Sequence, residues 1–224
     1  MKLTEDKTEE QINSLNDIRA LMENSSRFTS LSGLSGISAG IIAILGSVLV
    51  SYSLPIGFFE QAKEIMNWTK NLNNTTSTPD SGTLQFLILI ALAVFTLAAI
   101  SALFFAGRKA KSNNTQLFSS AGKKFIFNHS IFLFTGALFS LVLIYYGIYF
   151  LVVPSLLIFF GLGLISVSKF SFNLIRSLGI VEIILGLILS FIPVYALLFF
   201  TIGFGVMNVV YGFIMYFNYD KTNS

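Results

Sequence analysis

One acidic residue, Glu182, stands deep inside a strongly apolar stretch, and it is the first candidate for chemistry in this sequence. A carboxyl group inside a membrane is costly and usually has a function. Glu182 lies about 12 Å from the nearer end of a predicted span over residues 174–192. If this span forms a tight hairpin with the next one around Pro193–Val194, Asn208 lies at nearly the same depth. We therefore predict Glu182 and Asn208 as an intramembrane polar pair that shares a hydrogen bond.

Two roles remain open for Glu182 at this point. In the first, the protonated carboxyl hydrogen-bonds Asn208 or a tyrosine and locks the helices together. In the second, the carboxyl titrates and couples the movement of a proton or a cation to another event. The predicted spans contain no second carboxylate that could complete a proton relay, which favours the structural role.

Other residues that usually carry chemistry are scarce. His129 is the only histidine, and the chain has no cysteine, so a metal site of the usual ligands is not expected. His129 also lacks serine and aspartate companions at the spacing of a catalytic triad. There is no phosphate-binding loop, dinucleotide fingerprint or metalloprotease helix. We therefore expect no catalytic residue, no metal and no cofactor, and we expect that the protein is not an enzyme.

Three of the apolar stretches carry the same pattern, in which two glycines lie seven residues apart. The residue three positions after the first glycine differs among the three stretches. Offsets of three and seven residues fall within an arc of about 60° on an α-helix, so each pattern forms a narrow stripe. Small residues let helix backbones approach closely in lipid, and we predict packing within one chain, with dimerisation through 36–40 as the alternative. The stripes consist of Gly33, Gly36 and Gly40; of Gly179, Glu182 and Gly186; and of Gly205, Asn208 and Gly212.

The composition requires a membrane setting for these stripes. Of the 224 residues, 54% are hydrophobic and 11% are charged, whereas a soluble domain carries about 25% charge. A disordered chain, a nucleic-acid-binding domain and an ordinary soluble enzyme are thereby excluded. We predict an all-α polytopic membrane protein with six transmembrane helices arranged as three hairpins, and Pro154 is expected to separate the third span from the fourth. The predicted spans are 31–54, 84–106, 131–151, 154–168, 174–192 and 195–216.

The distribution of positive charge predicts the orientation. Twelve of the 14 Lys and Arg residues fall in alternate segments outside the spans or at the span end next to such a segment, and only Lys63 and Lys70 fall on the other side. Positive residues accumulate on the cytoplasmic side of membrane proteins. We therefore expect both termini in the cytoplasm, with the chain in the bacterial inner (plasma) membrane.

Two further segments flank the spans. Residues 1–30 are predicted as a cytoplasmic amphipathic helix, because apolar residues recur at helical intervals after a capping box at Thr8 and Gln11. This helix could pack on the membrane domain or dock a soluble partner. The external loop, 55–83, contains an amphipathic stretch with the sole tryptophan, Trp68, which is typical of an interfacial anchor.

Two resemblances to known families add to these predictions. The last two spans show a weak similarity to the glycine–proline–glycine hairpins of HdeD-type membrane proteins, which implies six spans. The matching residues are Gly179, Gly186, Pro193, Gly203 and Gly212. The chain also resembles uncharacterised six-span inner-membrane proteins of Bacteroidota-type bacteria, which implies location and architecture. The stretches that carry this likeness are 18–19, 22–23, 25–28, 31–36, 178–186 and 203–212.

Two functions follow as hypotheses. The first is a non-enzymatic regulatory or scaffold membrane protein that acts through a partner, either another protein or a second copy of the chain. The second is a small transporter or channel that uses Glu182 and has a water-accessible cavity beside Glu182 and Asn208. In both hypotheses the lipid bilayer is the surrounding partner, and nucleic acid is not.

Overall fold

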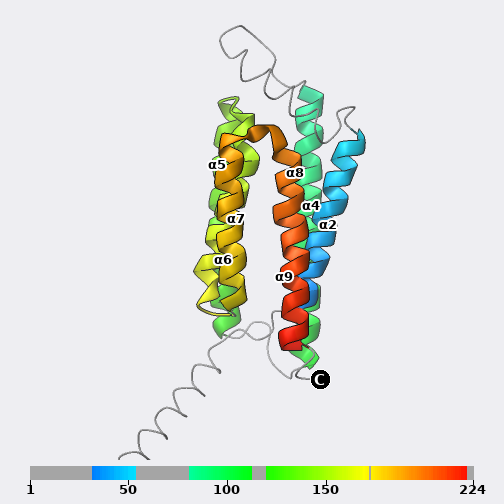
Figure 1. Ribbon diagram of the computed structural model, residues 1–224, viewed down its shortest axis with the longest axis vertical. Helices are drawn as coiled ribbons and strands as arrows, with labels where there is room; N and C mark the ends of the chain where they lie inside the picture. The colour runs from blue at the N-terminus through cyan, green and yellow to red at the C-terminus, as the bar shows by residue number, and fades with distance from the viewer. Residues whose placement is uncertain (1–31, 54–80, 113–119, 172, 221–224) are drawn as a thin grey trace, which may run out of the picture.

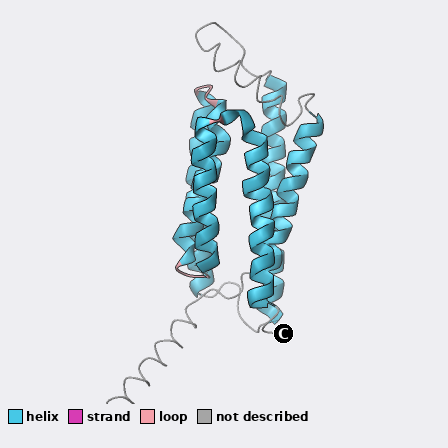
Figure 2. Cartoon of the chain, in the orientation of Figure 1, coloured by secondary structure: helices cyan, strands magenta, loops and turns pink. Residues whose placement is uncertain are grey.

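The structure, a computed structural model, describes residues 32–53, 81–112, 120–171 and 173–220, which are almost entirely helical. No strand occurs in these ranges (Figures 1 and 2). They contain six helices that are long and apolar enough to cross a membrane, which indicates a multi-pass membrane protein. The predicted N-terminal helix and most of the external loop, including Trp68, lie outside the described residues.

Four of the six spans are single α-helices, and the other two are composite. The single helices are α2 (Gly33–Ser53), α4 (Ser81–Ser112), α5 (Ser120–Tyr145) and α7 (Asn173–Phe191). The fourth span joins a short 3₁₀ turn, η2 (Tyr149–Leu151), to α6 (Val152–Ser168). A second 3₁₀ turn, η3 (Pro193–Tyr195), leads to the last span, which combines α8 (Ala196–Phe200), a π-helical segment η4 (Thr201–Met207), α9 (Asn208–Met215) and η5 (Tyr216–Asp220).

The spans pack as two three-helix units (Figure 1). In the first unit, α2 lies between α4 and the last span; in the second, α6 lies between α5 and α7. The fifth and sixth spans are joined by the short turn η3 but pack loosely on each other, since α7 packs mainly on α6 and the last span packs mainly on α2. We call the zone where α6 and α7 meet the last span the seam. Contacts across the seam are sparse compared with those inside each unit.

The small-residue stripes explain this pairing. A Cβ atom placed on Gly40 would lie 2.6 Å from the carbonyl oxygen of Gly205, and one on Gly212 would lie 2.8 Å from that of Gly33. The stripes of α2 and the last span therefore face each other within one chain. The stripe of α7 instead faces α6, where a Cβ on Gly179 would lie 2.7 Å from the carbonyl oxygen of Gly161. Close backbone approach of this kind drives helix association in lipid.

The boundary between the third and fourth spans differs from the prediction. Helix α5 runs from Ser120 to Tyr145, about eleven residues earlier than the predicted start. Gly147, two residues after the helix end, has a left-handed φ of 73°. The N–H groups of Gly147 and Ile148 donate to the carbonyls of Ile144 and Leu143 at 3.0 and 2.8 Å. This is the hydrogen-bond pattern of a Schellman cap. Pro154 does not break the chain there, because it lies in the first turn of α6, where no intrahelical N–H bond is required.

Substituting Gly147 by alanine is expected to destabilise the protein by about 1–2 kcal/mol, the cost of a left-handed conformation for a residue with a Cβ. Nothing lies within 4 Å of an added Cβ at this position, so the cost is conformational and not steric. Gly147→Asn should be milder, because asparagine tolerates this conformation. The thermal unfolding midpoint in mild detergent measures both variants, and equal midpoints for Gly147→Ala and the wild type would contradict the cap.

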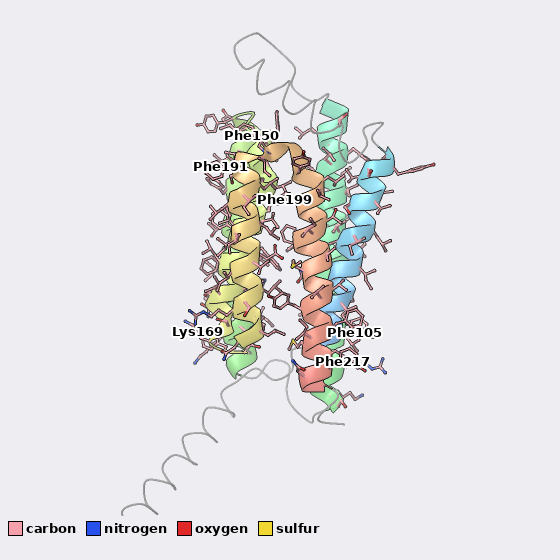
Figure 3. All side chains as sticks on the ribbon, in the orientation of Figure 1. Phe105, Phe150, Lys169, Phe191, Phe199 and Phe217 are labelled. Atoms are coloured by element: carbon pink, nitrogen blue, oxygen red, sulfur yellow. The ribbon has the colours of Figure 1, made fainter. Side chains whose placement is uncertain are left out.

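Every lysine and arginine that the structure describes lies at one end of the bundle, which we call the basic end. Figure 3 shows Lys169 near this end, whereas Phe150 and Phe191 lie at the opposite end. The residues of the basic end are Arg108, Lys109 and Lys111 of α4, Lys123 and Lys124 of α5, Lys169, and Arg176 of α7. Such one-sided clustering is the pattern that positions a membrane protein across its bilayer.

Candidate functional site

The side chain of Glu182 lies at the seam and has no exposed surface at all. It projects from α7 toward the last span, where its Oε2 atom lies 2.6 Å from the position that a Cβ on Gly203 would take. A methyl carbon of Leu157, from α6, lies at the same distance from that position. The carboxyl group is therefore enclosed where α6, α7 and η4 meet.

Neither carboxyl oxygen of Glu182 has a hydrogen-bond partner among the described residues. Buried polar groups in proteins are nearly always hydrogen-bonded. Leaving one without a partner costs about 1–3 kcal/mol, and more if it is charged. An enclosed carboxyl without a donor is therefore a costly feature, and no helix of the described bundle gains a polar contact from it.

The structure does not bring Glu182 and Asn208 together as the predicted pair. The Asn208 side chain donates from Nδ2 to the carbonyl oxygens of Phe204 at 3.1 Å and Gly203 at 3.4 Å, within its own span. The physical reason is that the stripe of the last span, which contains Asn208, faces α2. The Asn208 carbonyl oxygen lies 3.2 Å from the position that a Cβ on Gly36 would take. The hydrogen bond that would have locked α7 to the last span is absent from the described residues.

The backbone opposite Glu182 is also unusual. Residues Thr201–Met207 form a π-helical segment, which is a rare conformation that occurs frequently at functional sites. Its Gly203 has no side chain, and that leaves the space which the carboxyl group occupies. Sequence reasoning named Gly203 only in a family resemblance and gave it no role. The only indication in the sequence was that residue 203 is a glycine, because nothing in the residue pattern predicts a π-helical segment.

A row of rings crosses the seam, and its central ring, Phe204, follows Gly203 in the sequence. The Phe204 ring of η4 lies between two other rings. Its centroid is 5.1 Å from that of Phe200, in α8, and 5.0 Å from that of Phe160, in α6. Phe160 also meets His129 of α5 at 5.7 Å. The His129 ring lies against Gly163 of α6, nine residues after the start of α5. Phe160 and Phe204 thus supply aromatic contact between the two units.

Comparisons with protein-family models, with curated proteins and with solved structures found no match. Both resemblances suggested by the sequence therefore stay predictions. The chemistry available at the seam follows from its own geometry. A carboxyl group enclosed between two loosely joined units, without a donor of its own, can hold a proton or pair with a cation. Within the described residues, no group of three or more His, Cys, Asp or Glu could hold a metal ion.

Proposed function

We propose that this protein is a non-enzymatic membrane transporter in which Glu182 binds an exchangeable proton or cation between the two three-helix units. The supporting observation is that the Glu182 carboxyl is fully buried and has no hydrogen-bond partner. A side chain kept for locking the bundle would be expected to bond a neighbour, as Ser38 and Ser101 do between α2 and α4 at 2.6 Å. Ionisable groups within membranes are typical of substrate and ion pathways.

The arrangement of the units supports movement at the seam. The turn η3 links α7 to the last span, and contacts between the units are sparse elsewhere. Rocking of one unit against the other would open Glu182 first to one side of the membrane and then to the other. In the present conformation the Glu182 carboxyl is fully buried. The transporter proposal therefore requires that water reaches this carboxyl only when the two units have moved apart.

We further propose that the basic end faces the cytoplasm of a bacterial inner membrane, with both termini on that side. Since the chain has no cysteine, single-cysteine variants carry no background reactivity. Lys111→Cys should react with a membrane-impermeant maleimide only from the cytoplasmic side. Tyr145→Cys, at the opposite end and 84% exposed, should react only from outside. The reverse pattern would overturn the orientation.

The same labelling tests alternating access. Tyr211 packs against the buried cluster near the basic end, and Phe200 lies in α8 near the opposite end. Tyr211→Cys should react from the basic side and Phe200→Cys from the opposite side, each slowly, because both side chains are only partly exposed in the present conformation. Adding Glu182→Gln should raise one rate and lower the other, since an amide cannot exchange the proton or cation that shifts the two openings.

Leu45→Cys is the control, because Leu45 faces lipid with 62% of its surface exposed and should react from neither side. Rates at Tyr211→Cys and Phe200→Cys that do not respond to Glu182→Gln would overturn the transporter proposal. The partner-dependent scaffold would then be the function to test, by native mass spectrometry of the protein from its own membrane with and without residues 1–24.

A further inference from the structure

The groups that surround Glu182 restrict what can bind there. Leu157 of α6 and Gly203 of the last span lie beside the carboxyl group, and neither has a polar side chain. Phe204 directly follows Gly203, and Phe160 is one helical turn after Leu157 on the same face of α6. The amide of Asn208 already donates within its own helix. The site thus combines one carboxyl group with apolar and aromatic surface.

This combination does not suit a small inorganic cation. Such ions take about six or more oxygen ligands, as calcium and magnesium do. Within the described ranges, Glu182 has no His, Asp or Glu companions that could complete a ligand set. An anion is excluded by charge, and a neutral apolar molecule would leave the carboxyl unpaired. A weakly hydrated cation with a large apolar surface suits both the carboxylate and the apolar, aromatic side chains around it.

We infer that the cargo is a lipophilic organic monocation, such as a substituted ammonium or phosphonium, which pairs with the Glu182 carboxylate and lies against the Phe160 and Phe204 rings. This inference rests on the proposed function. A cation over an aromatic face is attracted by about 0.5–2 kcal/mol, with the larger values in desolvated sites. The Phe160 and Phe204 rings come from the two different units and contact each other across the seam, with centroids 5.0 Å apart. The cation reaches the ring faces when the two units move apart.

Charge balance makes the binding an exchange. When the cation arrives, the carboxyl O–H bond breaks, the proton leaves to water, and the carboxylate pairs with the cation. One positive charge replaces another, so the site never holds an uncompensated charge inside the membrane. The return of a proton from the other side releases the cargo there.

Tetraphenylphosphonium is the probe, measured by isothermal titration calorimetry on the full chain in mild detergent. We expect one saturable site per chain, with one proton released per cation when buffers of different ionisation enthalpy are compared. Glu182→Gln should weaken binding at least tenfold and remove the proton release. Phe204→Leu should weaken it about three- to tenfold, whereas Phe213→Leu, on the lipid-facing side of the same span, should leave it unchanged.

Tetraphenylborate, an anion of the same shape, should not bind in a Glu182-dependent way. Phosphonium binding that survives Glu182→Gln would show partition into the apolar bundle and overturn the inference. So would a binding constant that does not respond to Phe204→Leu. Failure of this inference is distinguishable from failure of the proposed function: labelling at Tyr211→Cys and Phe200→Cys that responds to Glu182→Gln, without phosphonium binding, would retain the transporter and reject the cargo.

Discussion

Replacing Glu182 by methionine is expected to raise the stability of the protein while abolishing its exchange activity. Methionine is unbranched and fills irregular space, so it can occupy the position between Leu157 and Gly203 without a polar atom. Removing a buried carboxyl that lacks a partner should return about 1–3 kcal/mol. A gain of stability with a loss of activity is typical of a residue that is kept for function.

The thermal midpoint in mild detergent and tetraphenylphosphonium exchange in liposomes measure the two halves of this prediction. Glu182→Gln should also lose the exchange and its pH dependence, but its stability gain should be smaller, since the amide is again a buried polar group without a partner. Ser155→Ala, which removes a hydroxyl bonded to the Val152 carbonyl at 2.8 Å, should lower stability slightly and serves as the opposite control. A clear loss of stability in Glu182→Met would indicate that Glu182 has a structural role.

The span architecture was readable because hydropathy and charge act locally. Runs of about 20 apolar residues identify transmembrane helices whatever their neighbours are, and the six helices follow. Glu182 could be singled out in the same way, because a carboxylate in such a run is exceptional, and its burial agrees. The effect of Pro154 was harder to predict, because it depends on the position of the proline within its helix. A proline in the first turn does not interrupt the helix.

The pairing of helices could not be read from the sequence, since it depends on which stripes meet. Three similar stripes allow several partners, and adjacency along the chain favoured the fifth and sixth spans. The structure instead matches Gly33, Gly36 and Gly40 with the last span, while Gly179 and Gly186 meet α6. Because the fifth and sixth spans pack loosely, Asn208 bonds within its own span and not with Glu182. The π-helical turn that places Gly203 opposite the carboxyl has no sequence pattern of its own.

The crossing of α2 with the last span leads to the second large effect. Gly40→Ala is expected to destabilise the protein by about 1–3 kcal/mol, because the added Cβ would lie 2.6 Å from the Gly205 carbonyl oxygen and 2.9 Å from the Val209 nitrogen. Both are backbone atoms, which cannot swing away. The helix axes must therefore separate, and the contacts along the whole crossing weaken.

Gly36→Ala is the matched control, since it lies one turn earlier on the same stripe and gains the same helix propensity, about 0.5–1 kcal/mol. Its added Cβ would lie 3.2 Å from the Asn208 carbonyl oxygen, which a small adjustment accommodates, so it should be near neutral. Unfolding midpoints that are equal for the two variants would contradict the close crossing. Cross-linking distinguishes the dimer alternative. If the stripe joined two chains, Gly40→Ala would reduce dimer yield and leave the stability of the monomer intact, whereas packing within one chain predicts the reverse.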